Sequence, residues 1–506
     1  MNPFPRKASL SAWSLVLSLY TLLAFHAPFF HHVLGHIERG FNGVLIVISL
    51  TLLILTLNFF FYSFVAFLGR GVGKGIISFT LIGNAIALYF VNNYEVLITD
   101  QMMGNVFNTQ FSEASGFYSF SFILYVLFLG ILPCVYVFAR KVDYGSWKAF
   151  GIRSGSSLGL ALVIAFGNMS NWPWIDRNST ELGALLMPWS YTVNSVRYYQ
   201  AERARNAKEI LLPDARFTTD SRDVCILIIG ESARSDHFSL LGYDKHTNRF
   251  TDKDSVTAYP ALSSATYTIA GVKAIVEPYD RSELYEILPN YLYRTGADVT
   301  WRTSNWGEPP VHIEKYYTKE TLKEMFPDAD ERYDGILLEG LEAEIRDCEK
   351  AKQLIILHTN TSHGPAYNTH YPSEFEVFTP VCNTVEMSKT NPEELLNAYD
   401  NSIVYTDWLI HSAIATLRAM PSVRGCVLYV SDHGESLGEN NLYMHGVPMA
   451  MAPREQIEIP FLLWTSDKTL HIKPLDVVGQ HHVFHTVLRF MDVDTPVYDA
   501  NMSLFE

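Results

Sequence analysis

The sequence predicts a chain in two parts, an α-helical transmembrane domain followed by an α/β domain with a mostly parallel central sheet sandwiched by helices. Three observations predict this fold class. Five apolar runs long enough to cross a bilayer precede residue 175. Residues 1–170 hold only 9 of the 38 Lys/Arg and 5 of the 53 Asp/Glu, which leaves residues 171–506 with a net charge of −19. After residue 215, short β-rich runs alternate with helical patterns, which is typical of a parallel sheet covered on both faces.

The composition excludes several classes of protein. Of the 506 residues 48% are hydrophobic and 18% charged, against about 25% charged residues in soluble globular proteins. A wholly soluble protein, a disordered one and a nucleic-acid binder with a basic face are therefore excluded. Five cysteines, none in a CxxC pair, are too few for a disulfide scaffold, and we expect separate buried thiols.

The apolar runs predict the membrane topology. A signal peptide does not fit, because the first run is long and four more follow it. Basic residues precede the first run and lie between the second and third and the fourth and fifth, whereas the 97–116 loop has none. The positive-inside rule therefore places the N-terminus in the cytoplasm and everything after the fifth run outside the cytoplasm, in a periplasm or on an outer face. The runs are Leu10–Phe30, Val44–Phe67, Ile76–Val96, Phe117–Ala139 and Gly155–Trp174.

These features give three predicted regions, a five-span domain (1–174), a connecting helix and linker (175–215, helical over Tyr191–Lys208) and a catalytic domain (216–506). In one extracytoplasmic loop Asn105, Thr109 and Glu113 follow at i, i+4 and i+8, so a helix there would carry all three on one face. Two interpretations stay open for this loop, a solvated amphipathic turn and a cradle for a lipid head group.

Five strands and one long helix are expected in the catalytic domain. The helix covers about Pro392 to Met420, with apolar positions at helical spacing. Ligands of such sheets gather beyond the carboxyl ends of the strands. The expected strands are Val224–Ile229, Asp298–Arg302, Leu354–His358, Cys426–Val430 and Ile459–Trp464.

Candidate metal ligands follow these strands. Glu231 comes directly after the first strand, and Asp432 and His433 come directly after the fourth. His363 follows the third strand, and His445 comes twelve residues after His433; each is followed by a glycine. A single carboxylate at a strand end is usually a helix cap, but oxygen and imidazole groups from several strand ends suit a zinc site.

A candidate nucleophile lies in the stretch Ser264-Ala-Thr266-Tyr-Thr268, which reads as a turn that opens a helix. A metal-bound threonine is a competent nucleophile because coordination lowers the pKa of its hydroxyl. Taken alone, such hydroxyls are more often helix caps.

At this point the chain resembles the lipopolysaccharide-modifying phosphoethanolamine transferases, which are inner-membrane enzymes with an alkaline phosphatase/sulfatase-like domain. The resemblance covers nearly the whole chain. Its most specific stretches are Gly230-Glu-Ser-Ala-Arg-Ser-Asp-His237 with Gly242-Tyr243, Asn397-Ala-Tyr-Asp-Asn-Ser-Ile-Val-Tyr-Thr-Asp407, and Ser431-Asp-His-Gly-Glu-Ser436 through His445-Gly446.

The resemblance implies site residues. Zinc ligands fall on Glu231, Thr268, Asp432 and His433, with Thr268 as the nucleophile and Thr266 as the alternative. The histidines that contact the phosphoryl group or a second zinc fall on His363 and His445. Residues implicated in phosphoethanolamine binding fall on Asn105, Thr109 and Glu113.

The chain also departs from the family pattern. Ser264 and Ala274 stand where relatives carry cysteines that flank the nucleophile, and Thr390 stands where Cys382 would have its partner. Glu308 and Pro309 occupy the usual Cys-Lys positions.

The resemblance implies a two-step transfer of phosphoethanolamine from phosphatidylethanolamine, through a covalent phosphothreonine, to lipid A, Kdo or a core sugar. Zn²⁺, the bilayer and the two lipids are the expected cofactor and partners, with no nucleic acid and a monomeric chain. The alternatives are transfer of another head group, such as phosphoglycerol, and a non-catalytic membrane-anchored binding protein. A sulfatase is disfavoured because the chain has no Cys/Ser-x-Pro-x-Arg stretch.

Overall fold

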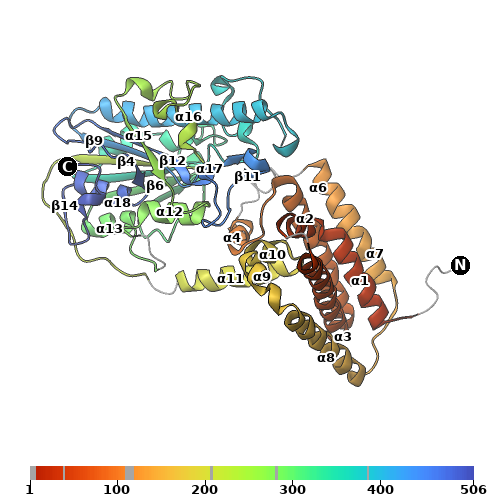
Figure 1. Ribbon diagram of the computed structural model, residues 1–506. Coiled ribbons are helices and arrows are strands. Elements are labelled where there is room, and N and C mark those ends of the chain that lie inside the picture. Colours follow the sequence, from red (N-terminus) through yellow and green to blue (C-terminus); the bar gives the residue numbers. More distant parts are fainter. Residues whose placement is uncertain (1–6, 38–39, 109–118, 206–208, 280–282, 385–386) are drawn as a thin grey trace. The chain divides into compact units, whose positions relative to one another are not determined.

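A computed structural model of the chain describes residues 7–37, 40–108, 119–205, 209–279, 283–384 and 387–506. The chain divides into two compact units, Met1–Tyr199 and Gln200–Glu506. Figure 1 shows that the first unit is built from helices and the second from a central sheet with helices on both of its faces. The predicted fold class, apolar helices followed by an α/β domain with a mostly parallel sheet, is confirmed.

The first unit contains three helices long and apolar enough to cross a membrane, or up to four if a bent pair counts as one span, within its described residues. The bent pair is α1 (Leu10–Phe25) and α2 (Ala27–His36), at 62° to each other. The others are α3 (Phe41–Tyr94), the stretch Phe120–Ala139, which contains α6 (Phe120–Tyr125) and α7 (Leu132–Ala139), and α8 (Trp147–Gly167). Shorter helices are α4 (Asp100–Asn108), α9 (Trp172–Arg177) and α10 (Ser179–Leu185), and α11 (Trp189–Arg205) covers most of the predicted 191–208 helix.

The long helix α3 contains two of the predicted apolar runs. Its backbone breaks at Arg70, where φ is 45° and ψ is −109°. Beyond the break, a Cβ at Gly73 would lie 2.3 Å from the carbonyl oxygen of Val65. Residues eight apart in a straight helix are separated by about 12 Å along its axis, so the chain turns back on itself here. Counting the two arms of α3 separately is what yields five spans, and that number stays a prediction.

The second unit is built on an eight-stranded sheet with the order β13-β5-β12-β9-β4-β8-β6-β7. All five expected strands are present, as β4 (Asp223–Gly230), β6 (Asp298–Thr303), β8 (Lys352–His358), β9 (Arg424–Ser431) and β12 (Glu458–Thr465). Three further strands complete it, β5 (Thr257–Leu262), β7 (Lys315–Thr318) and β13 (Val478–Gly479). Two small ribbons pair β3 (Arg216–Phe217) with β14 (Val493–Asp494) and β10 (Ser436–Leu437) with β11 (Tyr443–Met444).

Strand direction determines which loops meet. Five adjacent strands run parallel to one another, in the order β7, β6, β8, β4 and β9. The next strand, β12, is antiparallel to β9. β5 is antiparallel to β12, so it runs in the same direction as β4 and β9. The loops that follow β4, β5, β6, β8 and β9 therefore emerge at one edge of the sheet.

The core lies on both faces of this sheet. Every residue of β4 and β8 is buried, as expected for central parallel strands. One face packs against α12 (Thr268–Val276), α13 (Leu288–Thr295) and α18 (His482–Phe490). The long helix α16 (Pro392–Arg418) confirms the predicted 392–420 helix, and Figure 1 shows it on the other face with α15 (Leu341–Asp347). α14 (Lys319–Met325) and α17 (Arg454–Ile457) are short, and all five cysteines are free.

Candidate functional site

Glu231, Asp432 and His433 meet because their strands are neighbours in register. β4 and β9 pair Ile229 with Val430 and Gly230 with Ser431. The next residues are Glu231 and Asp432, so both carboxylates leave the sheet side by side. Asp432 continues this pairing by donating its backbone N–H to the carbonyl of Gly230 at 3.0 Å.

Thr268, the first residue of α12, joins this cluster from the loop after β5. Its hydroxyl lies 3.4 Å from Glu231 Oε2, to which it donates, and 3.5 Å from His433 Nε2. α12 comes this close because Gly271 lacks a side chain, since a Cβ there would lie 2.3 Å from the carbonyl oxygen of Asp432. The sequence alternative Thr266 is engaged elsewhere, donating its hydroxyl to the carbonyl of Val447 at 2.7 Å.

Hydrogen bonds orient the two carboxylates. Glu231 accepts from the Asn305 amide at 2.8 Å and from the Ser232 hydroxyl at 2.7 Å. Asp432 Oδ1 accepts the backbone N–H groups of Ser232 and His433 at 3.0 and 2.7 Å. Oδ2 of Asp432 is buried without a hydrogen-bond partner and lies 3.3 Å from His433 Nε2. A buried carboxylate oxygen of this kind has a lone pair available to coordinate a cation.

The protonation of His433 follows from its neighbours. Its Nδ1 lies 2.9 Å from the carbonyl oxygen of Gly434, and because a carbonyl only accepts, Nδ1 carries the hydrogen. Nε2 then presents its lone pair to the carboxylates and to Thr268. Burial lowers the pKa of His433 to about 3, and the nearby His445 contributes to this shift. The imidazole is therefore neutral at neutral pH, as a metal ligand must be.

The carboxylates are electrostatically coupled. Burial raises the pKa of Asp432 well above its ordinary range, and the charge of Glu231 adds to the shift. Burial also acts to raise the pKa of Glu231, but the nearby histidines, His433 first, outweigh it and hold that pKa below its ordinary value. Two buried carboxylates, a neutral imidazole and a hydroxyl form a donor set that fits a divalent cation such as zinc. Glu231, His433 and His445 also place ligand atoms within 4.8 Å of one another.

Two histidines line the same site. The His445 ring lies 4.2 Å from that of His433 and 5.9 Å from that of His363, between ring centroids. His445 Nδ1 lies 3.0 Å from Glu435 Oε2. Both histidines are buried, at 9% and 4% exposure. The structure thus brings together six of the predicted residues, namely Glu231, Thr268, His363, Asp432, His433 and His445.

The remaining predicted residues belong to the helical unit. Asn105 is half-buried on α4. Thr109 and Glu113 lie outside the described residues. The predicted alignment of all three on one helix face therefore stays a prediction.

Sequence reasoning assigned no role to the groups that support the ligands. Asn305 follows β6 and bridges Glu231 to the carbonyl of Thr359 at 2.8 and 2.9 Å. The position of Asn305 just beyond the end of a predicted strand was a signal that could have marked it as a candidate site residue. Glu435 lies two residues after His433, but only the fold shows that it contacts His445. Glu308, one of the departures, accepts from the Tyr316 hydroxyl and lies 3.7 Å from His358 Nδ1.

Two family models match the chain. Residues 223–493 match the model described as Sulfatase, and residues 53–203 match the model described as phosphoethanolamine transferase EptA/EptB. Together they cover most of both units.

The chain is also similar to individual proteins along its length. It is 32% identical to phosphoethanolamine transferase EptA of Helicobacter pylori, over 97% of this chain and 96% of the relative. The structure of the integral membrane lipooligosaccharide phosphoethanolamine transferase A from Neisseria meningitidis superposes with a TM-score of 0.88 at 26% identity, covering 99% of each chain. The C-terminal periplasmic domain of EptC from Campylobacter jejuni matches 59% of this chain and 97% of its own, at 34% identity and a TM-score of 0.53.

Proposed function

The chain belongs to the phosphoethanolamine transferase family, and on that premise we propose that it transfers phosphoethanolamine from phosphatidylethanolamine to lipopolysaccharide and releases diacylglycerol. Lipid A, Kdo and core sugars are the candidate acceptors. One observation carries the proposal, namely that the Thr268 hydroxyl lies 3.4 Å from Glu231 and 3.5 Å from His433. No such cluster is needed for a threonine that merely caps a helix.

Zinc is the proposed cofactor, held by Glu231, Thr268, Asp432 and His433. The fit rests on the neutral imidazole and on the unpartnered Oδ2 of Asp432. When bound, zinc supplies Lewis acidity that activates a hydroxyl and offsets phosphoryl charge. Asn305 and Ser232 hold the Glu231 carboxylate in place through their hydrogen bonds.

The first step is attack by Thr268. Its Oγ forms a bond to the phosphorus of the donor, and the bond from phosphorus to the glycerol oxygen breaks. Glu231 already accepts a hydrogen bond from this hydroxyl and is the nearest acceptor for its proton. A protonated His445 or His363 gives a proton to the departing glycerol oxygen, which leaves as diacylglycerol.

The second step reverses these roles. A hydroxyl or phosphate oxygen of the acceptor attacks the phosphothreonine, and the same histidine, now neutral, takes the proton of an acceptor hydroxyl. The bond between phosphorus and Thr268 breaks, and Thr268 takes back its proton from Glu231. With a phosphate as acceptor, the histidine regains its proton from solvent. Glu435 keeps the hydrogen of His445 on Nδ1, so Nε2 is the nitrogen that exchanges protons.

The membrane arrangement belongs to the same proposal. Residues 1–174 form five spans of the inner membrane, with the N-terminus in the cytoplasm. Residues 175–215 join these spans to residues 216–506, which act in the periplasm. Asn105, Thr109 and Glu113 bind the donor head group, and the chain acts as a monomer. Apolar helices in the first unit support membrane anchoring.

The test is release of diacylglycerol from labelled phosphatidylethanolamine. We expect Thr268→Ala to abolish release and Thr268→Ser to restore part of it. Thr266→Val, which removes the other threonine hydroxyl of the loop and about 1 kcal/mol of hydrogen bonding, should retain turnover. Full release by Thr268→Ala would refute the scheme. Phosphatidylglycerol offered in parallel separates this activity from transfer of phosphoglycerol.

A further inference from the structure

An apolar segment without a charged side chain directly follows the site histidine. Residues 447–453 read Val-Pro-Met-Ala-Met-Ala-Pro, and we name them the methionine loop. Met449 and Met451 are each 42% exposed. The backbone N–H of Met451 donates to the carbonyl of Pro448 at 2.8 Å, which closes a turn at the tip.

The root of the methionine loop is fixed to the segment that carries the nucleophile. The N–H of Gly446 donates to the carbonyl of Thr266 at 2.8 Å, and the hydroxyl of Thr266 donates back to the carbonyl of Val447. The N–H of Val447 donates to the buried side chain of Gln456 at 3.1 Å. A group bound by the exposed methionines is therefore held beside Thr268 and His445.

A third exposed apolar side chain lies near the methionine loop. Seven large apolar side chains are exposed among the described residues of the second unit, and Leu262, at the end of β5, adjoins the segment that anchors the loop. The loop thus adds two exposed methionines to one exposed leucine at the same end of the sheet. Exposed apolar patches mark interaction sites. The seven are Ile210, Leu211, Leu262, Met325, Met449, Met451 and Val477.

We propose that the methionine loop inserts into the surface of the bilayer that holds the donor lipid, among its glycerol groups and acyl chains. This rests on the proposed function in that the donor is a membrane lipid. Three observations favour a lipid occupant over a protein one. The loop is continuous with the site, the same chain carries membrane-length apolar helices, and the loop is free of charge in a region with a net charge of −19.

The negative charge of the surrounding surface explains why only the methionine loop would insert. An acidic surface is repelled by anionic lipids, so only an uncharged segment enters the interface without this cost. Methionine is unbranched and adapts to disordered chains. Arg454, which follows the loop and is exposed, lies 3.6 Å from Glu458 at its nearest carboxylate and is placed to meet a lipid phosphate.

The kinetic test uses the full chain in phosphatidylcholine vesicles with two donors. One is long-chain phosphatidylethanolamine in the same bilayer, and the other is dihexanoyl phosphatidylethanolamine dissolved as monomers. We expect Met449→Gln with Met451→Gln to raise the apparent KM for the bilayer donor about tenfold and to leave the soluble donor unaffected. Met325→Gln, at an equally exposed methionine on α14, is the matched control. Equal loss with both donors would overturn the proposal.

A second measurement needs no turnover and so separates this proposal from the proposed function. Cysteine placed at position 449 or 325, in a Cys134→Ser, Cys348→Ser background, is labelled with bimane in vesicles that contain doxyl-labelled lipid. Quenching at 449 and not at 325 is expected. Equal quenching at the two positions would overturn the proposal. Protection of 449 from aqueous iodide without lipid quenching would also do so, and would indicate that protein covers the loop.

Discussion

Nδ1 of His445 lies 3.0 Å from Oε2 of Glu435, and this carboxylate is fully buried. Because an ionised carboxylate only accepts hydrogen bonds, the pair keeps the hydrogen of His445 on Nδ1. Nε2 is then the nitrogen that can exchange protons with a substrate. Partners of this kind orient histidines in metal and phosphoryl sites. Glu435 is therefore a positioning residue, and its effect should depend on His445.

Glu435→Gln tests this relationship. The amide keeps the size of the side chain but no longer specifies which nitrogen of His445 carries the hydrogen. We expect kcat for donor cleavage to fall by about 10- to 100-fold, with little change in KM. Steady-state kinetics with labelled donor provide the measurement.

A double-mutant cycle is the control for Glu435. Combining Glu435→Gln with His445→Ala should cost no more than His445→Ala alone, because the carboxylate acts through the imidazole. Additive losses would show that Glu435 has a separate role.

Metal removal should affect both stability and activity. Two buried carboxylates repel each other without a cation, so a chelator is expected to lower the melting temperature and abolish diacylglycerol release, and added Zn²⁺ should restore both. Metal analysis of the purified chain would accompany the melting curves. In His433→Ala the chelator should cause a much smaller shift in melting temperature. Unchanged activity after complete metal removal would contradict the assignment.

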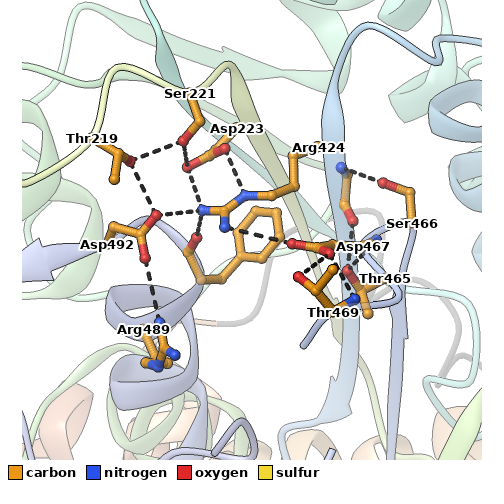
Figure 2. A network of polar contacts seen from close by, with 12 residues as sticks. Thr219, Ser221, Asp223, Arg424, Thr465, Ser466, Asp467, Thr469, Arg489 and Asp492 are labelled. Atoms are coloured by element: carbon orange, nitrogen blue, oxygen red, sulfur yellow. Dashed lines mark hydrogen bonds and ion pairs between the residues drawn. The ribbon is translucent and has the colours of Figure 1, made fainter. Parts of the chain in front are cut away.

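A buried charge network at the opposite edge of the sheet should control stability without touching the site. Figure 2 shows Asp223 accepting from Arg424, which also contacts Asp492. Lys352, buried like Asp223, is a further donor to the same carboxylate. Asp223→Asn should cost about 3 kcal/mol of unfolding free energy because it leaves the buried ammonium of Lys352 without its anion. Thermal melting measures the loss.

The control for this network is an exposed ion pair nearby. Arg216 and Asp494 lie 2.8 Å apart with side chains 79% and 54% exposed. Arg216→Gln should therefore change stability by less than about 1 kcal/mol. Folded Asp223→Asn should keep its transfer activity, and a selective loss of activity would contradict a purely structural role.

His485 should make stability depend on pH. Its Nδ1 accepts the N–H of Asp499, and its Nε2 lies 3.2 Å from the carbonyl of Pro278. Burial lowers its pKa below the ordinary 6.5. The unfolded chain therefore binds the proton more readily, and stability present above pH 6.5 is lost as the pH falls toward the folded-state pKa. His485→Gln, which keeps one acceptor and one donor, should flatten melting temperature against pH between 7 and 5. An unchanged slope would contradict this.

Patterns with strong periodicity were predictable. The five hydrophobic strands and the 392–420 helix were found because consecutive or helically spaced apolar residues indicate buried strands and helices. β5 was missed because it carries Pro260, which weakens a strand signal. The direction of β5 is important because β5 brings the loop that leads to Thr268 to the edge where β4 and β9 end.

The amino-acid order alone determined the apolar helices, the central strands and the candidate site residues, because these depend on residues close together along the chain. Only the tertiary structure decided which groups touch. Glu231 and Asp432 are 201 positions apart, and strand register makes them neighbours. The position of the Thr268 hydroxyl beside Glu231, the support from Asn305 and the pairing of Glu435 with His445 likewise depend on packing between distant segments, which no local pattern encodes.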